Sequence, residues 1–360
     1  MTQPTEPRWS AEFGGHWITA SHAGCRAVAG NAAAFSSARG VHVPPSALYD
    51  RGIRIFGLEH DAPVHREHRD ILRAAVGASA SSVAEGLIEL CLQELLDQLD
   101  WRQEVDLIAQ LANPLPLDVV FAVIGGDPEF KPEMKALTDA LLGRTTLESG
   151  ADPAARVHEI ARTMVQRRVA APLDDWISGL ADSQVLGEPL SLEQMVEAVV
   201  SLITGGHHST SRGLGSLLAR LVTEPGLQEQ LRAEPALIPA AVEETLRLHT
   251  PLPEFSRCAV TGTEVGGVRV GAGQHVQLRY DVANRDDVVF AEPAEFRLDR
   301  RHSQHLAFGF GPHRCVGIHL ARAEMRLAVE KLCDRTVNLV LAREVRWRGP
   351  AEPEALWVRA

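Results

Sequence analysis

The stretch Phe308-Gly309-Phe310-Gly311-Pro312-His313-Arg314-Cys315-Val316-Gly317 decides the fold, because it places one cysteine in a glycine-rich turn directly before a segment with helical periodicity. The N-terminus of a helix favours a thiolate through its dipole and its unpaired backbone N–H groups. The loop glycines allow a close approach to a bulky partner, because they carry no Cβ. The pattern leaves three roles open for this cysteine: a nucleophile, a metal ligand, or a small buried apolar residue.

The cysteines of the chain are few, odd in number and far apart: Cys25, Cys91, Cys258, Cys315 and Cys333. This spacing argues against a disulfide framework and against a closed zinc site. We therefore expect a reducing, cytoplasmic location, in which a functional cysteine acts singly. Charged groups near Cys315 add positive potential to its loop: His313 when protonated, Arg314 and Arg322.

The composition of the 360-residue chain excludes several classes of protein. With 36 basic and 47 acidic side chains the net charge is −11, which disfavours a nucleic-acid partner. The apolar content is ordinary, which excludes global disorder. No apolar run approaches the roughly 20 residues of a membrane span, so we expect no membrane partner. Residues 1–10 are polar, do not resemble a signal peptide and are expected to be flexible.

The order of local patterns predicts a mainly α fold with a minor β region. A short strand is predicted over residues 14–20, before a helix that opens at Ser21. Helical patterns broken by prolines run from residue 64 to about 248, and β-like patterns follow to about residue 280, with a hairpin at 265–270. A loop region leads to a last helix over about 316–332. With no linker visible, we expect one domain.

One predicted helix carries an unusual centre. Ser191 and Gln194 form a capping box, and the helix can run to shortly before Pro225, which is roughly 30 residues. Its middle holds Gly205 and Gly206, and each interior glycine costs about 1 kcal/mol relative to alanine. The pair indicates either close packing of another helix or a flat group lying against this one.

The cysteine loop resembles the haem-binding signature of the cytochromes P450, Phe-x-x-Gly-x-x-x-Cys-x-Gly. The matching residues are Phe308, Gly311, Cys315 and Gly317. His313 stands where soluble bacterial-type members of this family often carry histidine. Three further segments resemble family motifs in the family's order: a His-x-x-x-Arg helix over 61–69, Glu244-Thr245-Leu246-Arg247, and the segment 284–300.

The resemblance implies a single-domain cytochrome P450 fold over residues 1–360, short at its N-terminus, with haem b as the cofactor. Cys315 would be the thiolate ligand of the haem iron, which favours O–O cleavage. The positions that match the family's haem propionate partners are His65, Arg69, Arg257 and His313. Other residues implied at the haem are Gly205 and Gly206 of the central helix and Phe308, Gly311 and Gly317 of the loop.

Glu244 and Arg247 are spaced i, i+3 and are expected to form a structural ion pair. Many relatives complete this network with an arginine just before the phenylalanine that Phe296 matches. This sequence has Glu295 there instead. Arg297 or Arg300 could substitute for the missing arginine.

The central helix departs from the family pattern, in which the glycines precede an acid and a threonine that manage protons for oxygen. Here His208 replaces the acid and Ser209 replaces the threonine. Ser209 keeps a hydroxyl, and an imidazole can shuttle protons near neutral pH. Three chemistries stay open: monooxygenation with a His208 relay, peroxide-driven oxygenation, and a cyclising or coupling reaction. In a further alternative, His208 points away and water carries the protons, and His207 is expected to pack or to face solvent.

The family architecture implies walls for a substrate pocket at Ile55, Phe56, Ser201, Thr204, Leu252, Pro253, Glu254 and Phe255. Thr204 and Glu254 suggest a polar or amino-acid-derived small-molecule substrate. The Glu254 carboxylate could bind an amine of such a substrate. We expect Glu254 instead to face solvent or to be structural. The oligomeric state is left open.

A ferredoxin-type electron donor with its reductase is expected, because the 360 residues hold no flavin or iron–sulfur domain. Its docking patch could comprise Arg66, Arg73, Arg314, Arg322 and Arg326, and an acidic redox protein would be steered there. The alternative is that these arginines are scattered over a solvated surface. A haem-binding sensor or a partner-recruiting scaffold without catalysis is the remaining alternative for the whole chain.

Overall fold

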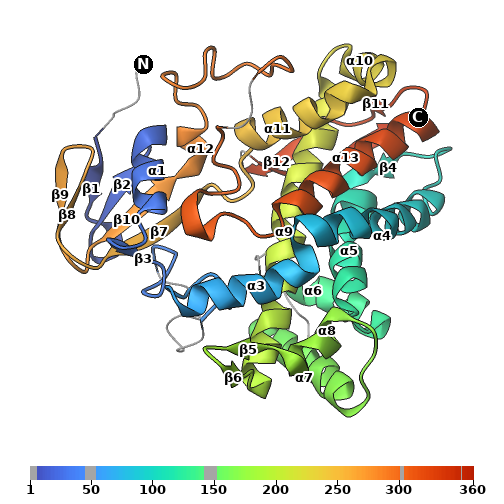
Figure 1. Ribbon diagram of the computed structural model, residues 1–360. Helices are drawn as coiled ribbons and strands as arrows, with labels where there is room; N and C mark the ends of the chain where they lie inside the picture. The colour runs from blue at the N-terminus through green and yellow to red at the C-terminus, as the bar shows by residue number, and fades with distance from the viewer. Residues whose placement is uncertain (1–5, 45–53, 142–151, 301–303, 350) are drawn as a thin grey trace. The chain divides into compact units, whose positions relative to one another are not determined.

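The computed structural model describes residues 6–44, 54–141, 152–300, 304–349 and 351–360. The chain forms two compact units, each built from segments that are distant in sequence (Figure 1). The first unit comprises residues 1–66 and 240–316, and the second comprises residues 67–239 and 317–360. Helices dominate the described residues and strands form a smaller part, so the predicted mainly α fold with a minor β region is confirmed.

The first unit is built on a five-stranded sheet in the order β1-β2-β10-β7-β3 (Figure 1). Its strands are β1 (Arg8–Ser10), β2 (His16–Thr19), β10 (His275–Arg279), β7 (Glu254–Ala259) and β3 (Phe35–Ser36). β2 and β10 pair in parallel and the other pairs are antiparallel. The register places Val276 of β10 opposite Trp17 on one side and Arg257 on the other. The sheet thus joins the N-terminal part of the chain to residues 254–279.

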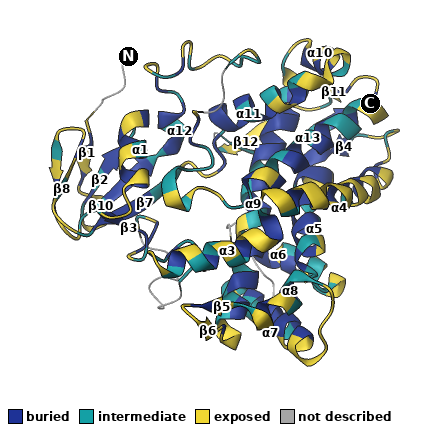
Figure 2. Ribbon diagram, in the orientation of Figure 1, coloured by how far each residue is buried: buried dark blue, intermediate teal, exposed yellow. Residues whose placement is uncertain are grey.

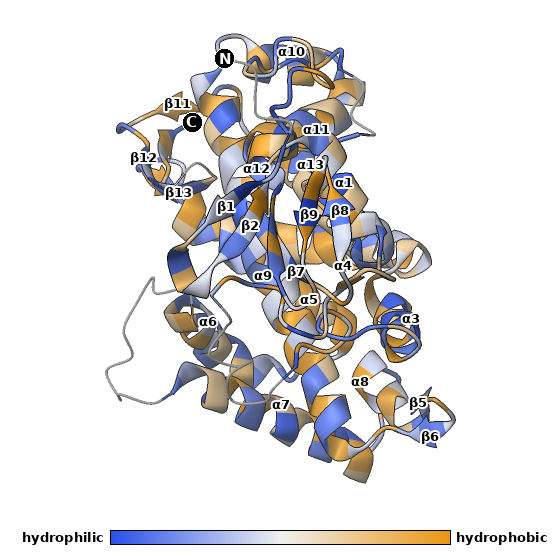
Figure 3. Ribbon diagram, turned by 90° about the vertical axis from the view of Figure 1, so that its left-hand side faces the viewer, coloured by the Kyte–Doolittle hydropathy of each residue, from blue (hydrophilic) through white to orange (hydrophobic). Residues whose placement is uncertain are grey.

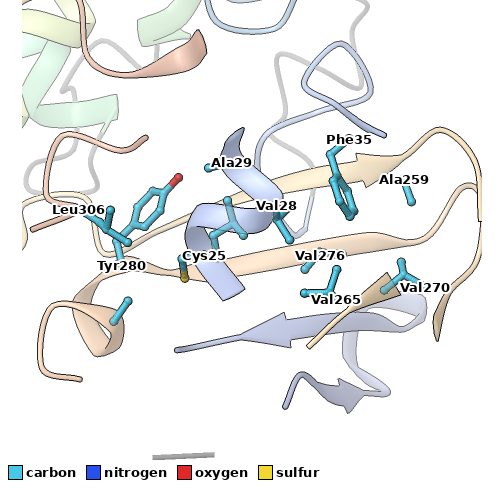
Figure 4. Packing of buried hydrophobic residues seen from close by; sticks show 12 residues of the cluster. Cys25, Val28, Ala29, Phe35, Ala259, Val265, Val270, Val276, Tyr280 and Leu306 are labelled. Carbon is cyan, nitrogen blue, oxygen red and sulfur yellow. The ribbon is translucent and has the colours of Figure 1, made fainter. Parts of the chain in front are cut away.

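Helix α1 (His22–Gly30) packs on this sheet and builds the hydrophobic core of the unit. The Ser21 hydroxyl caps the helix by accepting a 3.1 Å hydrogen bond from the Gly24 amide, as the predicted helix start required. Figure 4 shows Cys25 and Val28 of α1 facing Val276 and Tyr280, with Phe35 in the same cluster. Burial of these apolar side chains fixes α1 on the sheet.

A predicted hairpin and several short helices complete the first unit. β8 (Thr263–Val265) and β9 (Val268–Val270) pair through Gly266 and Gly267, whose φ angles are 54° and 83°, as a two-residue hairpin turn of this kind requires. The helices are η1 (Glu12–Gly14), α12 (Tyr280–Ala283) and η6 (Gly311–His313). α11 (Ile238–Leu248) belongs to this unit from Ala240 onward. α3 (Val64–Val76) begins in this unit and continues into the other.

Residues 8–10, which we expected to be flexible, form β1. The reason is pairing with β2, since Trp9 lies opposite Trp17 in the register. Their rings also meet edge to face, with centroids 5.2 Å apart. An aromatic cross-strand pair of this kind stabilises a short strand.

The second unit is a helical assembly around α9 (Leu192–Thr223). Its other helices are α4 (Ala78–Asp97), η2 (Ile108–Ala112), α5 (Pro114–Ile124), η3 (Pro128–Phe130), α6 (Lys131–Leu141), α7 (Pro153–Ala170), α8 (Trp176–Gly179), η4 (Leu180–Asp182), α10 (Leu227–Ala233), η5 (Pro235–Leu237) and α13 (Ile318–Arg335). α9 packs against α5, α7 and α13. Figure 2 shows α9 largely buried, whereas α4 exposes one side along its length. Along α7, hydrophilic and hydrophobic residues alternate (Figure 3), as in an amphipathic helix.

Short strands lie at the edges of the second unit. β4 (Val105–Asp106), β14 (Trp357–Arg359) and β11 (Val340–Leu341) form one sheet, and the pairs β5 (Gln184–Val185) with β6 (Glu188–Pro189) and β12 (Arg346–Gly349) with β13 (Glu352–Ala355) form two more. Four of these strands, β11 to β14, follow α13 along the chain.

The predicted long helix is confirmed as α9, which has 32 residues. The Ser191 side chain accepts from the Gln194 amide, while the Gln194 side chain accepts from the Ser191 amide at 2.9 Å. This reciprocal capping box satisfies two otherwise unpaired donors at the helix start. Pro116 lies in the first turn of α5, where a missing N–H costs nothing, so it does not break this helix.

Within the described residues, one helical stretch, Val64–Asp97, is long enough and contains an apolar segment sufficient to cross a membrane. It consists of α3 and α4, separated at Gly77. Ile88 and Leu92 of this stretch are fully buried. Buried core helices meet the same criterion, so this composition does not assign the stretch to a membrane.

Candidate active site

The cysteine loop holds Cys315 in an exposed position. The Cys315 amide donates to the Phe308 carbonyl at 2.9 Å, and the Gly309 amide donates to the Leu306 carbonyl at the same distance. These bonds close the loop on itself in the part of the chain that precedes α13. An exposed thiol contradicts the interpretation of Cys315 as a small buried apolar residue and leaves it available as a ligand or nucleophile.

The thiols of the remaining cysteines are more buried than that of Cys315 and less able to react or to bind a metal. Cys25 and Cys258 are buried, and Cys91 and Cys333 are partly buried. Burial raises the pKa of the Cys25 thiol, raises that of Cys91 to about 11, and also raises that of Cys333. A raised thiol pKa lowers the fraction of reactive thiolate, so Cys315 is the cysteine best placed to act singly.

Helix α1 fixes the shape of the cysteine loop. Gly311 has φ 74°, and a Cβ at this position would lie 2.5 Å from the Ala29 carbonyl oxygen. The loop backbone therefore needs glycine here both for its conformation and for its contact with α1. The family resemblance identified Gly311 but could not show that α1 is the element it packs against.

A cation–π contact adds to this packing. The Arg26 guanidinium lies over the Phe310 ring, 4.0 Å from its centroid. A Cβ on Gly30 would meet the same ring at 3.1 Å. The sequence carries no signal for Arg26 or Gly30, because nearly 300 residues separate them from the loop.

Arg257 fits the role of a partner for an anionic group. It lies on β7, is only 4 % exposed, and donates to the Ser256 carbonyl at 2.7 Å. Burial lowers the pKa of Arg257, although the nearby Tyr280 and Asp61 act in the opposite direction. No acidic side chain among the described residues forms an ion pair with Arg257. A buried cation is costly until it is paired, so a haem propionate suits this position.

His65 and His313 lie together in the first unit. Their ring centroids are 3.8 Å apart with 34° between the planes, and His65 is buried at the start of α3. Arg69 follows one turn later on the same side of α3. The structure thus brings two of the predicted propionate partners into contact, and their N–H groups can donate to a carboxylate.

The other predicted site residues divide between the units. His65, Arg257, Phe308, Gly311, His313 and Cys315 belong to the first unit, and Arg69, Gly205, Gly206, His208, Ser209 and Gly317 belong to the second. Gly317 is the N-cap residue of α13. Each unit therefore carries its own set of candidate residues.

The glycine pair of α9 is not explained by helix packing. A Cβ on Gly205 would meet no atom of the described residues within 4 Å, and one on Gly206 would make an ordinary 3.4 Å contact with Val120. Gly215 of the same helix behaves differently, because its Cβ would lie 3.0 Å from Ile108. Close packing thus accounts for Gly215, whereas Gly205 is compatible with a flat group lying against the helix.

The hydroxyls of α9 are held by the helix itself. Ser209 donates to the Gly205 carbonyl at 3.1 Å and Thr204 donates to the Val200 carbonyl at 2.7 Å. Such back-bonding is common for hydroxyls inside helices. Ser201 is partly buried on the same helix. Ser209 can rotate toward another acceptor only by giving up its present bond.

Both histidines of α9 are buried, His207 completely and His208 to more than nine-tenths. His207 contacts the Asn113 carbonyl and the Thr138 hydroxyl, at 2.9 and 3.1 Å. Of the two environments expected for His207, packing is therefore correct and exposure to solvent is wrong. Its polar partners lie between η2 and α5 and on α6, which explains why the local sequence could not show them.

The predicted pocket residues near β7 have mixed exposure. Phe255 lies 5.6 Å from the His42 ring and 6.3 Å from Tyr280, and Leu252 and Pro253 are exposed. Glu254 lies 3.5 Å from the Arg279 guanidinium and is 40 % exposed. This weak ion pair favours the structural and solvent-facing interpretation of Glu254 over amine binding.

Two other predicted pocket residues lie in the segment before α3. Phe56 is buried and Ile55 is partly buried. The Ile55 amide donates to the Glu59 carboxylate at 3.1 Å. This bond orders the backbone at Ile55, and the pocket assignment of both residues stays a prediction.

The predicted ion pair is confirmed as part of a buried network. The Arg247 guanidinium donates to both oxygens of Glu244, at 2.8 and 2.7 Å, and both side chains are 0 % exposed. Arg247 also donates to the carbonyls of Asn284 and Pro293. Arg300 donates to Glu244 at 3.0 Å and replaces the arginine that Glu295 displaces.

The proposed basic patch is partly neutralised. Arg326 forms ion pairs with Glu85 at 3.0 Å and Glu330 at 2.9 Å, and Arg73 pairs with Asp70. Arg66 and Arg314 are exposed in the first unit. The arginines retain less net positive charge than their number suggested, and their use as one docking surface stays a prediction.

Comparisons with known proteins agree with this geometry. The cytochrome P450 family model matches residues 145–335. The chain is 31% identical to cytochrome P450 107B1 of Saccharopolyspora erythraea, over 81% of this chain and 73% of the relative. It is equally identical to mycinamicin IV hydroxylase/epoxidase of Micromonospora griseorubida, over 83% and 79% of the two chains.

A solved structure supports the same assignment. The crystal structure of HmtN, a post-tailoring hydroxylase involved in himastatin biosynthesis, is similar with a TM-score of 0.88 and 27% identity. The similarity covers 99% of this chain and 94% of that one. The residues that the sequence matched to motifs of this family are an exposed Cys315, a buried Arg257 and a buried Glu244–Arg247 ion pair. The chain belongs to the cytochrome P450 family and is a haem b-containing oxidoreductase of the monooxygenase type that oxidises organic molecules.

Proposed function

We propose that this protein oxidises a polar or amino-acid-derived small molecule of specialised metabolism at a haem held by Cys315. The observation that carries the proposal is the exposed Cys315 thiol in a loop closed by its own backbone bonds and packed on α1. The names of two similar proteins, a mycinamicin hydroxylase/epoxidase and a himastatin post-tailoring hydroxylase, support specialised metabolism as the setting. When bound, a thiolate-ligated haem supplies oxidising chemistry that favours O–O cleavage.

The chain's own cations would bind and orient the cofactor. Arg257 is buried without an acidic partner among the described residues, and the stacked rings of His65 and His313 offer further N–H donors. Arg69 adds a fourth group on α3. Charge-assisted hydrogen bonds to carboxylates are about twice as strong as neutral ones, so these residues would retain the two propionates.

His208 and Ser209 would handle protons during the reaction. The Ser209 hydroxyl can donate to an acceptor after rotating away from the Gly205 carbonyl. The His208 imidazole can accept a proton and pass it on, which an alanine cannot do. An imidazole in place of a carboxylate changes the charge of the relay but keeps its ability to move protons.

Electrons would come from a ferredoxin-type protein with its reductase, and the small-molecule substrate would be free in the cytoplasm. No nucleic-acid or membrane partner is proposed. We propose that residues 1–360 act as one cytochrome P450 domain, in which both compact units are required for activity.

The decisive experiment is the spectrum of the reduced carbon monoxide complex. We expect the purified protein to show the red-shifted band of thiolate-ligated haem, and the Cys315→Ser variant to lose it. Cys333→Ser is a matched control, because its thiol is partly accessible and lies outside the loop. Absence of the band in the unmodified protein would overturn the proposal and favour the sensor or scaffold alternative.

A second experiment separates the possible chemistries. With an identified substrate, His208→Ala should lower the amount of product formed per reducing equivalent consumed. An unchanged ratio would exclude a relay role for His208. Robust turnover with hydrogen peroxide, in the absence of a reductase, would replace the ferredoxin-dependent reaction with the peroxide-driven one.

A further inference from the structure

The centre of α9 places two histidine rings in contact, with their planes tilted relative to each other. The ring centroids of His207 and His208 are 4.4 Å apart, and their planes differ by 33°. Neighbouring residues on a helix point about 100° apart, so their side chains do not normally meet. This contact therefore requires that the His207 ring be held in place by something other than α9.

Two other segments of the second unit hold the His207 ring. Its Nε2 lies 2.9 Å from the backbone carbonyl of Asn113, which separates η2 from α5, and its Nδ1 lies 3.1 Å from the Thr138 hydroxyl on α6. A carbonyl oxygen can only accept, so Nε2 carries a hydrogen and donates it. The ring thus bridges α9, α6 and the start of α5, and its plane is fixed at both nitrogens.

The Thr138 hydroxyl can satisfy His207 in either protonation state. It lies 2.9 Å from the Met134 carbonyl and 3.0 Å from the Lys135 carbonyl, as well as near His207 Nδ1. A rotating hydroxyl can donate to Nδ1, or donate to a carbonyl while it accepts from a protonated Nδ1. The ring therefore keeps its position whichever proton it carries.

A second bond ties the same turn of α9 to Asn113. The Ser211 hydroxyl, one turn after His207, donates to the Asn113 side-chain oxygen. On the other side of His207 lie Gly205 and Gly206, where the helix is intrinsically weakest. The contacts of His207 and Ser211 hold the helix at the point where its own sequence gives it least rigidity.

We propose that His207 is a positioning residue that fixes the ring of His208 through their stacked contact and through its own hydrogen bonds to Asn113 and Thr138. The proposal deepens the proposed function and rests on it, because that function assigns proton handling to His208. His207 itself has both nitrogens occupied by protein groups and acts only through its neighbour. A residue that merely filled space would need neither hydrogen bond.

The variants separate the hydrogen bonds from the bulk of the ring. His207→Gln retains a donor near Nε2 for the Asn113 carbonyl, whereas His207→Leu removes both polar contacts. Ser216→Ala is the matched control. Ser216 is fully buried on α9 and loses one hydrogen bond to a backbone carbonyl, that of Ala351, more than two turns away from His207. Each variant is made with His208 and in the H208A background.

The first readout needs no substrate and no turnover. In the reduced carbon monoxide form of the holoenzyme, the ring C–H resonances of His208 are assigned by their loss in H208A. We expect them to shift and broaden in H207L, to remain sharp in H207Q, and to stay unchanged in S216A. Unchanged His208 resonances in H207L would overturn the proposal, whether or not His208 takes part in catalysis.

The second readout is the hydrogen peroxide released per NADH consumed, with a surrogate ferredoxin and its reductase and without substrate. H207L should raise this ratio by about twofold, the lower end of the coupling expected for residues in contact, and H207Q should raise it less. In the H208A background the effect of H207L should disappear. An equal effect in both backgrounds would show that His207 acts independently and would overturn the proposal. If H208A alone released as much hydrogen peroxide per NADH as the unmodified protein, the proton role of His208 would be refuted. The His208 resonances would still test whether His207 positions His208.

Discussion

The Arg300 guanidinium donates a 3.0 Å hydrogen bond to the buried carboxylate of Glu244, which also accepts two bonds from Arg247. Arg300 further donates to the carbonyls of Ala291 and Glu292. It therefore ties α11 to the segment that leads toward the cysteine loop. Of the two arginines that the sequence offered as substitutes, the structure selects Arg300, while the Arg297 side chain pairs with Asp299 at the surface.

This selection predicts unequal effects for two neighbouring arginines. Arg300→Ala should lower the free energy of unfolding by about 3 kcal/mol, because it removes one partner of a buried charged network. Arg297→Ala is the control, since its side chain pairs only with exposed acids, and exposed pairs contribute little. Urea unfolding of both variants measures the difference. Equal midpoints for the two would contradict the assignment.

The same network predicts a dependence of stability on pH. Burial raises the pKa of Glu244, but the bonds and charge of Arg247, together with Arg300, outweigh it and hold the pKa below its ordinary value of 4.5. The folded protein thus binds this proton less readily than the unfolded chain, so the stabilisation is present above pH 4.5 and is lost as the pH falls through the lowered pKa.

Glu244→Gln should accordingly cost about 3–5 kcal/mol at pH 7. The difference between the variant and the unmodified protein should shrink as the pH falls below 4.5. Urea unfolding at a series of pH values checks both statements. A difference that grew on acidification would have the wrong sign for a carboxylate with a lowered pKa.

Replacing Arg257 should leave the stability of the apoprotein intact but weaken the binding of haem. Arg257→Leu removes a buried cation that no acidic side chain among the described residues pairs with, so the apoprotein should be no less stable than before. The affinity for haem should fall by roughly tenfold to a hundredfold, the value of one charge-assisted bond.

Haem transfer to an acceptor protein and thermal unfolding of the apoprotein measure these two effects. Arg279→Leu is the control, because Arg279 on β10 already pairs with Asp281 at 2.6 Å. A loss of apoprotein stability in Arg257→Leu without a loss of haem affinity would show that Arg257 is only structural.

The glycines of α9 predict a contrast within one helix. Gly205→Ala places a Cβ in open space and should stabilise the apoprotein by about 0.5–1 kcal/mol. Gly215→Ala should destabilise it, because its Cβ would meet Ile108 at 3.0 Å. Thermal unfolding of the two apoproteins tests the contrast. If Gly205→Ala also lowered haem incorporation, the flat group that the sequence suggested would be the haem.

The contact between Arg26 and Phe310 predicts a measurable stabilisation of the cysteine loop. Arg26→Met keeps the apolar stem and removes the charge, and should cost about 1 kcal/mol, the value of a partly buried cation–π contact. Arg26→Lys should recover part of that loss. Thermal unfolding of the holoenzyme checks the series, and a methionine variant as stable as the original would show that the charge contributes nothing.

Much of the fold follows from local chemistry that the sequence displays. The start of α1 at Ser21, the capping box of α9 and the Gly266–Gly267 hairpin depend on neighbouring residues, so they could be predicted. β1 could not, because its stability depends on pairing with β2 and on the contact between Trp9 and Trp17.

The candidate site divides in the same way. The sequence by itself determined Cys315, the loop glycines and the Glu244–Arg247 pair, because the spacing of these residue types within a loop or one helix turn carries their chemistry. Only the tertiary structure decided that α1 holds the loop through Gly311 and Arg26, that Arg300 completes the ion network, and that Asn113 and Thr138 hold His207. These partners lie far away along the chain, and only folding brings their atoms within bonding distance.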